Sequence, residues 1–209
     1  MIENKEIINL IHIGKCGGGY VQDILKNNNF NIRVIHIEKA IFNKNEKYII
    51  LLRNPISRFI SAFNWRYNIV VVNNNQTERF KGEKETLNYF KNVNNLAENI
   101  SSFDINNNYI HHVKENIHFY IHDFLSNCKK ENIIGVIVTE TLNEDLKNLF
   151  TIDSDNYEKI NMNKNNYNIQ LSKLGYENLK LYLHTDYDCI DKLYNLGCLS
   201  NKHYDILSK

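Results

Sequence analysis

Lys15 and the glycines at positions 17, 18 and 19 are the residues of this chain best suited to bind an anion. They follow an apolar run, Ile7–Ile13, which predicts a buried strand, and they precede Tyr20–Leu25, whose spacing predicts a helix. Glycine lets the backbone turn tightly and expose its N–H groups, the helix start adds partial positive charge, and lysine adds a full charge. We therefore predict a phosphate-binding turn made of Gly14, Lys15, Cys16, Gly17, Gly18, Gly19 and Tyr20.

The order of residues in this turn differs from the common nucleotide-binding loops. A Walker A loop, GxxxxGK[ST], places its lysine after the glycines and a hydroxyl residue beside it to bind magnesium. Here Lys15 precedes the glycines and Cys16 follows it, so the motif supplies no obvious magnesium ligand. The GxGxxG pattern of dinucleotide-binding folds is absent from the sequence as well. A loop that hydrolyses ATP or GTP is therefore a poor match.

A second set of candidate ligands lies in the segment RNPISRFIS, from Arg53 to Ser61. Arg53 follows the apolar run Tyr48–Leu52, so we expect it at the carboxyl end of a strand, where open α/β sheets bind ligands. Pro55 suits the first position of a helix, in which Arg58 and Ser61 share a face. Two guanidinium groups and a hydroxyl can hold a second phosphate, because arginine binds phosphate bidentately.

These turns need strands and helices to position them, and the chain alternates between the two. The alternation predicts an α/β fold, with a central parallel sheet flanked by helices, in a single domain over residues 1–209. The predicted strands are Ile7–Ile13, Asn31–Ile37, Tyr48–Leu52 and Ile133–Val138, with a shorter one at Ile117–Ile121. The predicted helices are Gly17–Lys26, Pro55–Arg66, Lys84–Asn99, a helix through Phe150 that begins with a capping box at Thr141–Glu144, and Leu171–Leu196, with a loop at Thr151–Gln170.

The two ligand-binding segments together resemble the motifs of the PAPS-dependent sulfotransferases, and among these the carbohydrate-type family. Its first motif reads like IPKTGGTS and its second like RxPxxRxxSxF; the chain has IHIGKCGGGY at residues 11–20 and RNPISRFISAF at residues 53–63. The first motif keeps the lysine and two glycines, with Gly14 in place of proline, Cys16 in place of threonine and Gly19 in place of a hydroxyl residue. The resemblance implies a P-loop-like sulfotransferase fold and PAPS, 3′-phosphoadenosine 5′-phosphosulfate, as the sulfuryl donor.

The resemblance also implies which residues hold the donor. Lys15 would stabilise the charge that develops on the leaving 5′-phosphate, and Gly17–Gly19 would surround the phosphosulfate. Arg53 and Ser61 would bind the 3′-phosphate, which stays on the product, 3′-phosphoadenosine 5′-phosphate. The acceptor would be a hydroxyl or amine of a saccharide or of another small molecule.

A hydroxyl acceptor also needs a general base to take its proton. Histidine titrates near neutral pH, and His36 stands at the end of the second predicted strand, at the same sheet edge as Lys15 and Arg53. Some members of the family carry a catalytic histidine between the two motifs, and others use a glutamate. We therefore predict His36 as the base, with Glu38 as the alternative, and expect His12, inside the first predicted strand, in the core or just behind the site.

Composition limits the other functions that the chain could have. A formal net charge of +1 argues against a general nucleic-acid binder. No apolar run approaches the ~20 residues that cross a bilayer, which predicts a soluble, cytoplasmic protein. The four cysteines form no CxxC pair, and His111, His112, His118 and His122 accompany no acidic or cysteine ligand motif, so no metal site is expected.

Two other functions stay open on the sequence alone. One is a small-molecule kinase of the P-loop type, which would require magnesium ligands. The other is a catalytically inactive relative of the sulfotransferases that holds a nucleotide or a partner without turnover, an alternative that the altered Cys16 and Gly19 support. Neither the acceptor nor the oligomeric state is encoded in a readable pattern.

Overall fold

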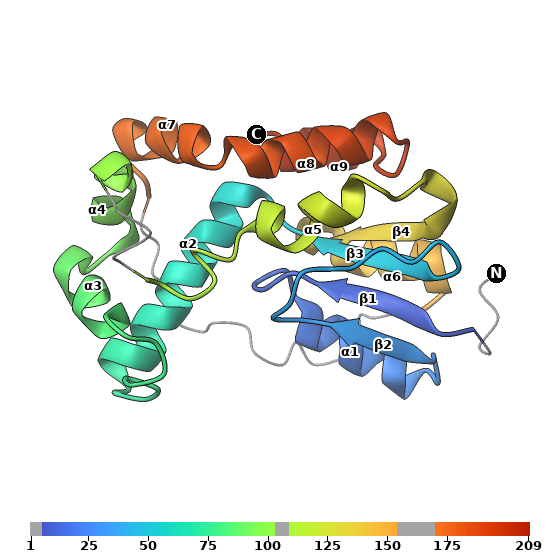
Figure 1. Ribbon diagram of the computed structural model, residues 1–209, viewed down its shortest axis with the longest axis horizontal. Coiled ribbons are helices and arrows are strands. Elements are labelled where there is room, and N and C mark those ends of the chain that lie inside the picture. Colours follow the sequence, from blue (N-terminus) through green and yellow to red (C-terminus); the bar gives the residue numbers. More distant parts are fainter. Residues whose placement is uncertain (1–5, 103–108, 154–169) are drawn as a thin grey trace. The chain divides into compact units, whose positions relative to one another are not determined.

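The computed structural model describes residues 6–102, 109–153 and 170–209 (Figure 1). Contacts divide the chain into two compact units, the first made of Met1–Asn54, Ile117–Met162 and Tyr187–Lys209 and the second of Pro55–Asn116 and Asn163–Asp186. The chain passes between the units repeatedly, so this division does not by itself separate two domains. A single domain over residues 1–209 stays a prediction.

The first unit is built on a four-stranded sheet. Its strands, in spatial order, are β2 (Ile32–Ile35), β1 (Ile8–His12), β3 (Lys47–Leu52) and β4 (Ile133–Val138). Each neighbouring pair is parallel. The predicted α/β class with a central parallel sheet is therefore confirmed.

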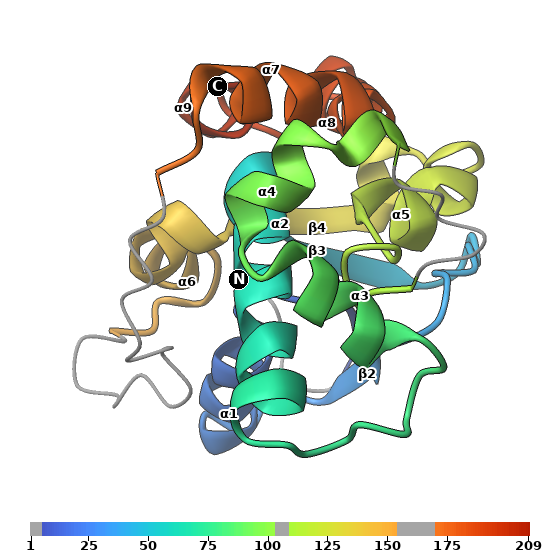
Figure 2. The same cartoon turned by 90° about the vertical axis from the view of Figure 1, so that its left-hand side faces the viewer.

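Helices cover both faces of this sheet, which explains why its strands are apolar runs. The helices α1 (Gly18–Asn27) and α6 (Leu142–Phe150) lie on one face and α5 (Ile117–Leu125) lies on the other (Figures 1 and 2). In β3, every residue from Tyr48 to Leu52 is 0% exposed. The core of the unit also takes side chains from the C-terminal part of α8 (His184–Asn195) and from α9 (Asn201–Leu207).

The second unit is helical. It contains α2 (Pro55–Tyr67), a π-helical turn at Asn68–Val72, α3 (Glu83–Phe90), α4 (Val93–Glu98), a 3₁₀ turn at Ile100–Ser102 and α7 (Lys173–Tyr182). Pro55 is the first residue of α2, as predicted, because its missing N–H needs no partner there. The remaining 3₁₀ turns, Lys130–Asn132 and Thr139–Thr141, flank β4 in the first unit.

The structure overturns the strand predicted at Ile117–Ile121, which is the start of helix α5. The buried residues of α5 are Ile117, Tyr120, Ile121, Phe124 and Leu125. Their spacing of three and four residues is helical, and a window of five residues is too short to distinguish it from a strand. His118 and His122 therefore do share a helix face, and their ring centroids are 4.2 Å apart.

Several helices also differ from the predictions. The helix expected over Lys84–Asn99 divides into α3 and α4 at Lys91, whose φ is 63°, and the one expected over Leu171–Leu196 divides into α7 and α8 at Leu183. Helix α6 has no capping box, since the side chain of Thr141 accepts no cap hydrogen bond, and the Thr141 hydroxyl donates to the Asp145 carboxylate. Helix α9 was not predicted, and most of the predicted loop at Thr151–Gln170 lies outside the described residues.

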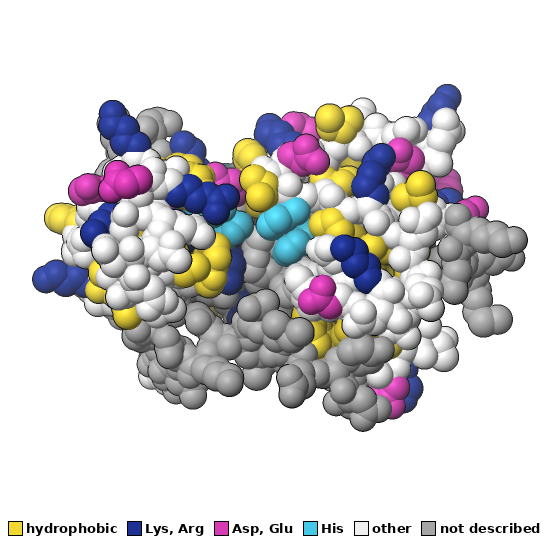
Figure 3. All heavy atoms as spheres, turned by 90° about the horizontal axis from the view of Figure 1, so that it is seen from below, with side chains coloured by type: hydrophobic (Ala, Val, Ile, Leu, Met, Phe, Trp, Pro, Cys, Tyr) yellow, Lys and Arg dark blue, Asp and Glu magenta, His cyan; other side chains and the backbone are white. Residues whose placement is uncertain are grey.

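Charged side chains of both signs are mixed on one face of the molecule. On the face shown in Figure 3, lysine and arginine side chains are interspersed with aspartate and glutamate among the described residues, and no continuous field of one sign covers it. This distribution matches the formal net charge of +1. A cationic site on this face must therefore be built locally, from a few residues.

Candidate functional site

The strand order places a switch point between β1 and β3 of the first unit. The chain leads from β1 through α1 to β2, which lies on one side of β1 in the sheet, whereas β3 and β4 lie on the other side of β1. Open α/β sheets bind ligands at the carboxyl ends of the strands where such connections diverge. His12 at the end of β1 pairs with Leu51 of β3, so the turns that follow these two strands are neighbours. The turn after β1 carries Lys15, and the turn after β3 carries Arg53.

The turn after β1 has the tight backbone that its glycines predict. Lys15 and Gly17 both have left-handed conformations, with φ of 72° and 75°. Helix α1 then begins at Gly18, with Gly17 as its N-cap, no side-chain cap hydrogen bond and no acidic residue in its first turn. The first N–H groups of a helix have no acceptor within the helix, and the helix dipole makes this end positive. The start of α1 therefore offers donors and positive charge to an anion beside Lys15.

The fold requires a glycine at some positions of this turn but not at all of them. Gly17 has a positive φ, which disfavours other residues. A Cβ on Gly18 would lie 2.0 Å from Cδ2 of His12, so this position requires a glycine for packing. A Cβ on Gly19 would meet nothing within 4 Å. The first two glycines are therefore explained by the fold, whereas Gly19 faces open space at the start of α1.

Cys16 and Gly14 are set back from this surface. Both are buried, and the Cys16 side chain is 1% exposed. The Cys16 N–H donates to the Ile13 carbonyl at 3.2 Å, which closes the turn. Cys16 therefore packs within the turn, and its contact with a ligand stays a prediction. Tyr20 is half-buried in the first turn of α1.

Arg53 lies against the turn that carries Lys15. Its Nη1 donates to the Lys15 carbonyl at 3.4 Å, and its Nε lies 3.8 Å from Oε1 of Glu140. Both charged side chains of this pair are partly exposed, 28% for Arg53 and 29% for Glu140. The structure thus brings Lys15 and Arg53 together at one sheet edge. It also adds Glu140, which sequence reasoning missed and which the position of β4 next to β3 brings there.

His36 follows β2, at the same edge of the sheet. Its ring stacks on that of His12, with centroids 3.9 Å apart and planes 11° apart, and its Nδ1 lies 2.8 Å from the His12 carbonyl oxygen. Burial, assisted by the nearby charges of His36 and Lys15, lowers the pKa of His12 to about 3. Glu38, the alternative base, is exposed on the segment after β2.

The lowered pKa of His12 predicts a loss of stability in mild acid. Below pH 6.5 the unfolded chain takes up a proton at His12, and the folded protein does so only near pH 3, so unfolding becomes easier as the pH falls through this range. Proton uptake by His12 in the unfolded chain should lower the unfolding free energy by about 2 kcal/mol when the pH falls from 7 to 5. Urea unfolding of the wild type and His12→Phe at both values measures the difference, and an equal pH dependence in the two proteins would contradict it.

Arg58 and Ser61 belong to helix α2 of the second unit. Arg58 is 0% exposed, and its Nη2 donates to the carbonyls of His112, at 3.0 Å, and Glu115. Arg58 is therefore packed within this unit, and its contact with a phosphate stays a prediction. Spacing along a helix shows which residues share a face, but it does not show whether neighbouring segments cover that face. Ser61 is half-buried, and its role as a ligand stays a prediction.

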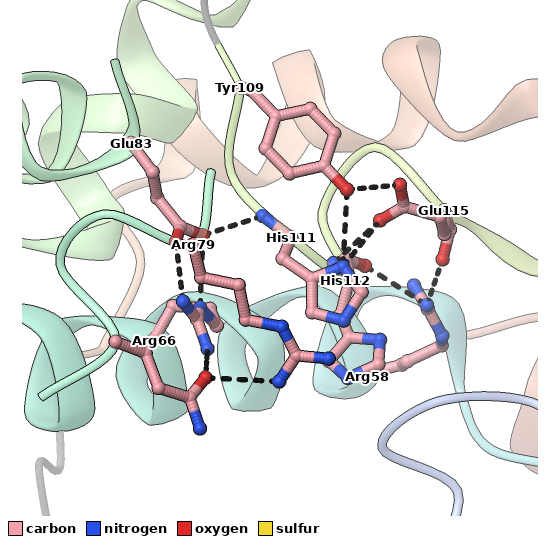
Figure 4. A network of polar contacts seen from close by, with 9 residues as sticks. Arg58, Arg66, Arg79, Glu83, Tyr109, His111, His112 and Glu115 are labelled. Atoms are coloured by element: carbon pink, nitrogen blue, oxygen red, sulfur yellow. Dashed lines mark hydrogen bonds and ion pairs between the residues drawn. The ribbon is translucent and has the colours of Figure 1, made fainter. Parts of the chain in front are cut away.

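A buried ion pair in the second unit was not apparent from the sequence (Figure 4). Arg66 donates through Nε and Nη2 to the two carboxylate oxygens of Glu83, at 2.9 and 2.5 Å, and the two side chains are 0% and 1% exposed. Gln76 accepts from Nη1 of Arg66, and Glu83 also accepts from the His111 N–H. One feature of the sequence did indicate that Arg66 is buried: it occupies a position in the apolar stripe of the helix predicted to begin at Pro55.

A second carboxylate completes this network. Glu115 accepts from the Tyr109 hydroxyl at 2.5 Å and from the His112 N–H at 2.8 Å, and it lies 3.2 Å from Nδ1 of His111. Burial by itself would raise the pKa of Glu115, but the hydrogen bonds from His111, Tyr109 and the His112 N–H outweigh burial and lower the pKa to about 2. These groups bond to one another, so both carboxylates of the network have hydrogen-bond donors inside the second unit.

Comparisons of this chain with protein-family models, with curated proteins and with solved structures gave no match. Within the described ranges, no helix is long and apolar enough to cross a membrane. Residues 6–102, 109–153 and 170–209 contain no group of three or more His, Cys, Asp and Glu side chains placed to hold a metal ion. The geometry at the shared edge of β1 and β3 is therefore what supports a function for this chain.

Proposed function

We propose that this protein is a PAPS-dependent sulfotransferase with the sulfotransferase version of the P-loop fold. It transfers a sulfuryl group to a hydroxyl or amine of a saccharide or another small acceptor. The observation that carries the proposal is the contact of Arg53 with the Lys15 turn at the β1–β3 switch point. Two cationic residues from two separate motifs are thereby neighbours at the carboxyl edge of the sheet, where open α/β sheets commonly bind ligands.

The residues at this edge fit a phosphosulfate. The start of α1 has no acidic residue in its first turn, and Lys15 stands before it. Gly19 leaves open space at the same place, so a phosphate or sulfate group can approach the backbone closely. Lys15 and Arg53 supply full positive charges, which a donor with phosphates at both the 5′ and 3′ positions requires.

PAPS, when bound, supplies an activated sulfuryl group on its 5′-phosphate. The acceptor oxygen forms a bond to sulfur, the bond between sulfur and the bridging oxygen breaks, and the electron pair of that bond stays on the 5′-phosphate. Lys15 stabilises the negative charge that develops there. His36 takes the proton of the acceptor hydroxyl, and Glu38 is the alternative base.

Ligand-induced stabilisation tests the proposal, because a ligand that binds only the folded state raises the unfolding temperature. We expect 3′-phosphoadenosine 5′-phosphate and PAPS to stabilise the protein and Mg-ATP not to do so. Transfer of the labelled sulfuryl group from PAPS to a panel of acceptors then measures turnover. Stabilisation by Mg-ATP alone would favour the kinase, binding without turnover would favour an inactive nucleotide-binding relative, and no stabilisation by either 3′-phosphorylated nucleotide would refute the site.

Arg53→Ala tests the assignment of this residue to the 3′-phosphate. We expect the affinity for 3′-phosphoadenosine 5′-phosphate to fall by about 10- to 100-fold, the value of a charge-assisted hydrogen bond, and the affinity for adenosine 5′-phosphate to fall much less. Calorimetry with both nucleotides measures this ratio. Arg33→Ala is the control, since Arg33 is an exposed arginine of β2 that also pairs with a glutamate, Glu46. Equal losses for the two nucleotides would remove Arg53 from the 3′ site.

A further inference from the structure

Two imidazole rings from separate strands are stacked at the ligand-binding edge of the sheet. His12 ends β1, and His36 follows β2, the strand that pairs with β1. The ring centroids are 3.9 Å apart, and the ring planes are within 11° of parallel. Stacking at this distance restricts the orientation of the His36 ring.

A hydrogen bond fixes which nitrogen of His36 carries the proton. Nδ1 of His36 lies 2.8 Å from the backbone carbonyl oxygen of His12. A carbonyl oxygen only accepts, so Nδ1 must be the donor, and the lone pair of the neutral ring is then on Nε2. His12 therefore contacts His36 in two ways: its ring stacks on the His36 ring, and its backbone carbonyl accepts the hydrogen bond from Nδ1.

Helix α1 in turn restricts the ring of His12. A Cβ on Gly18 would lie 2.0 Å from Cδ2, 2.1 Å from Nε2 and 2.3 Å from Cγ of His12, so the first residue of α1 packs directly on this ring. Only a glycine at position 18 leaves room for it. The low pKa of His12, which burial chiefly causes, keeps this ring uncharged at neutral pH, so it does not repel a proton that arrives on His36.

We propose that His12, held by Gly18, is a positioning residue that presents Nε2 of His36 as the proton acceptor of the site. This inference rests on the proposed function, in which His36 is the base of sulfuryl transfer. The acceptor proton moves to Nε2 and its electron pair goes to the new oxygen–sulfur bond, which leaves His36 as an imidazolium. The Nδ1–H bond to the His12 carbonyl then becomes charge-assisted and therefore stronger.

The first test reads the tautomer of His36 directly, by ¹⁵N NMR of histidine-labelled full-length protein at neutral pH. The wild type should show His36 with its proton on Nδ1. His12→Ala keeps the backbone carbonyl but removes the stacked ring, so the His36 ring can turn away from that carbonyl and a mixture of tautomers is expected. His12→Phe retains a planar ring that holds His36 against the carbonyl and should keep the wild-type signal. An unchanged His36 spectrum in His12→Ala would overturn the proposal.

A matched pair of variants perturbs the same contact from helix α1. Gly18→Ala places a methyl group against the His12 ring and should disturb the His36 signal, whereas a Cβ at Gly19 meets nothing within 4 Å, so Gly19→Ala should leave that signal unchanged. Both changes put alanine in the first turn of one helix, so helix propensity is matched. Equal spectra for Gly18→Ala and Gly19→Ala would contradict the role of Gly18.

Kinetics with PAPS separates this inference from the proposed function. His12→Ala should lower kcat by about 10- to 100-fold through misplacement of the base, with little change in KM for PAPS, and His12→Phe should restore most of it. A wild type that never turns over PAPS would refute the sulfotransferase, while the NMR spectra still decide whether His12 sets the tautomer of His36. A wild-type kcat in His12→Ala would refute the positioning role alone.

Discussion

Replacing Lys15 by alanine should lower kcat for sulfuryl transfer by about 10²–10³-fold, the usual loss when one donor to a developing anion is removed. Negative charge accumulates on the leaving 5′-phosphate in the transition state, and Lys15 stands at the start of α1, where the donor's phosphosulfate is proposed to bind. The fold should be retained, because the Lys15 side chain is only partly buried at the surface of the turn. Steady-state kinetics with labelled PAPS measures the effect.

Because of its backbone conformation, Lys15 can be tested more cleanly by Lys15→Gly than by Lys15→Ala. Its φ of 72° is a conformation that glycine adopts freely, so Lys15→Gly removes the charge and relieves backbone strain at once. This variant should be at least as stable as the wild type and equally inactive, which separates catalysis from folding. Lys26→Ala, in the last turn of α1, is the control that should keep full activity. Near-wild-type kcat in Lys15→Gly would exclude Lys15 from the reaction.

Glu83→Ala should reduce the unfolding free energy by about 3–5 kcal/mol, the usual cost of leaving one partner of a buried ion pair alone. The guanidinium of Arg66 is 0% exposed and both of its bonds to Glu83 would be lost, together with the bond from the His111 N–H to the same carboxylate. Urea unfolding at neutral pH measures the loss. Replacing both partners, as Arg66→Met with Glu83→Leu, should recover much of it, since an apolar pair leaves no buried charge.

An exposed pair in the same unit serves as the control for Glu83. Lys173 and Glu177 are 3.9 Å apart on α7, with side chains 90% and 59% exposed. Glu177→Ala should change the unfolding free energy by less than about 0.5 kcal/mol, because water screens this pair. If Glu83→Ala cost no more than Glu177→Ala, the buried network of Figure 4 would not be what stabilises this unit.

Local sequence patterns were sufficient to predict the elements that form the sheet edge where we propose that the ligand binds. Strand β1 lies within the predicted Ile7–Ile13, and β3 matches Tyr48–Leu52 with one added residue. Gly17 and Pro55 mark the starts of α1 and α2, because each suits a backbone position that few other residues tolerate. The error at α5 arose where a short apolar run fits both a strand and a helix.

The sequence by itself determined the α/β class, the parallel sheet and the turn that carries Lys15, since hydrophobic period and glycine chemistry are local properties. Only the tertiary structure decided which groups surround each charged or titratable side chain. It buried Arg58 against carbonyls, set Glu140 beside Arg53 and stacked His12 on His36. These pairings join residues far apart in the chain, and burial and hydrogen bonding depend on what the rest of the fold brings alongside.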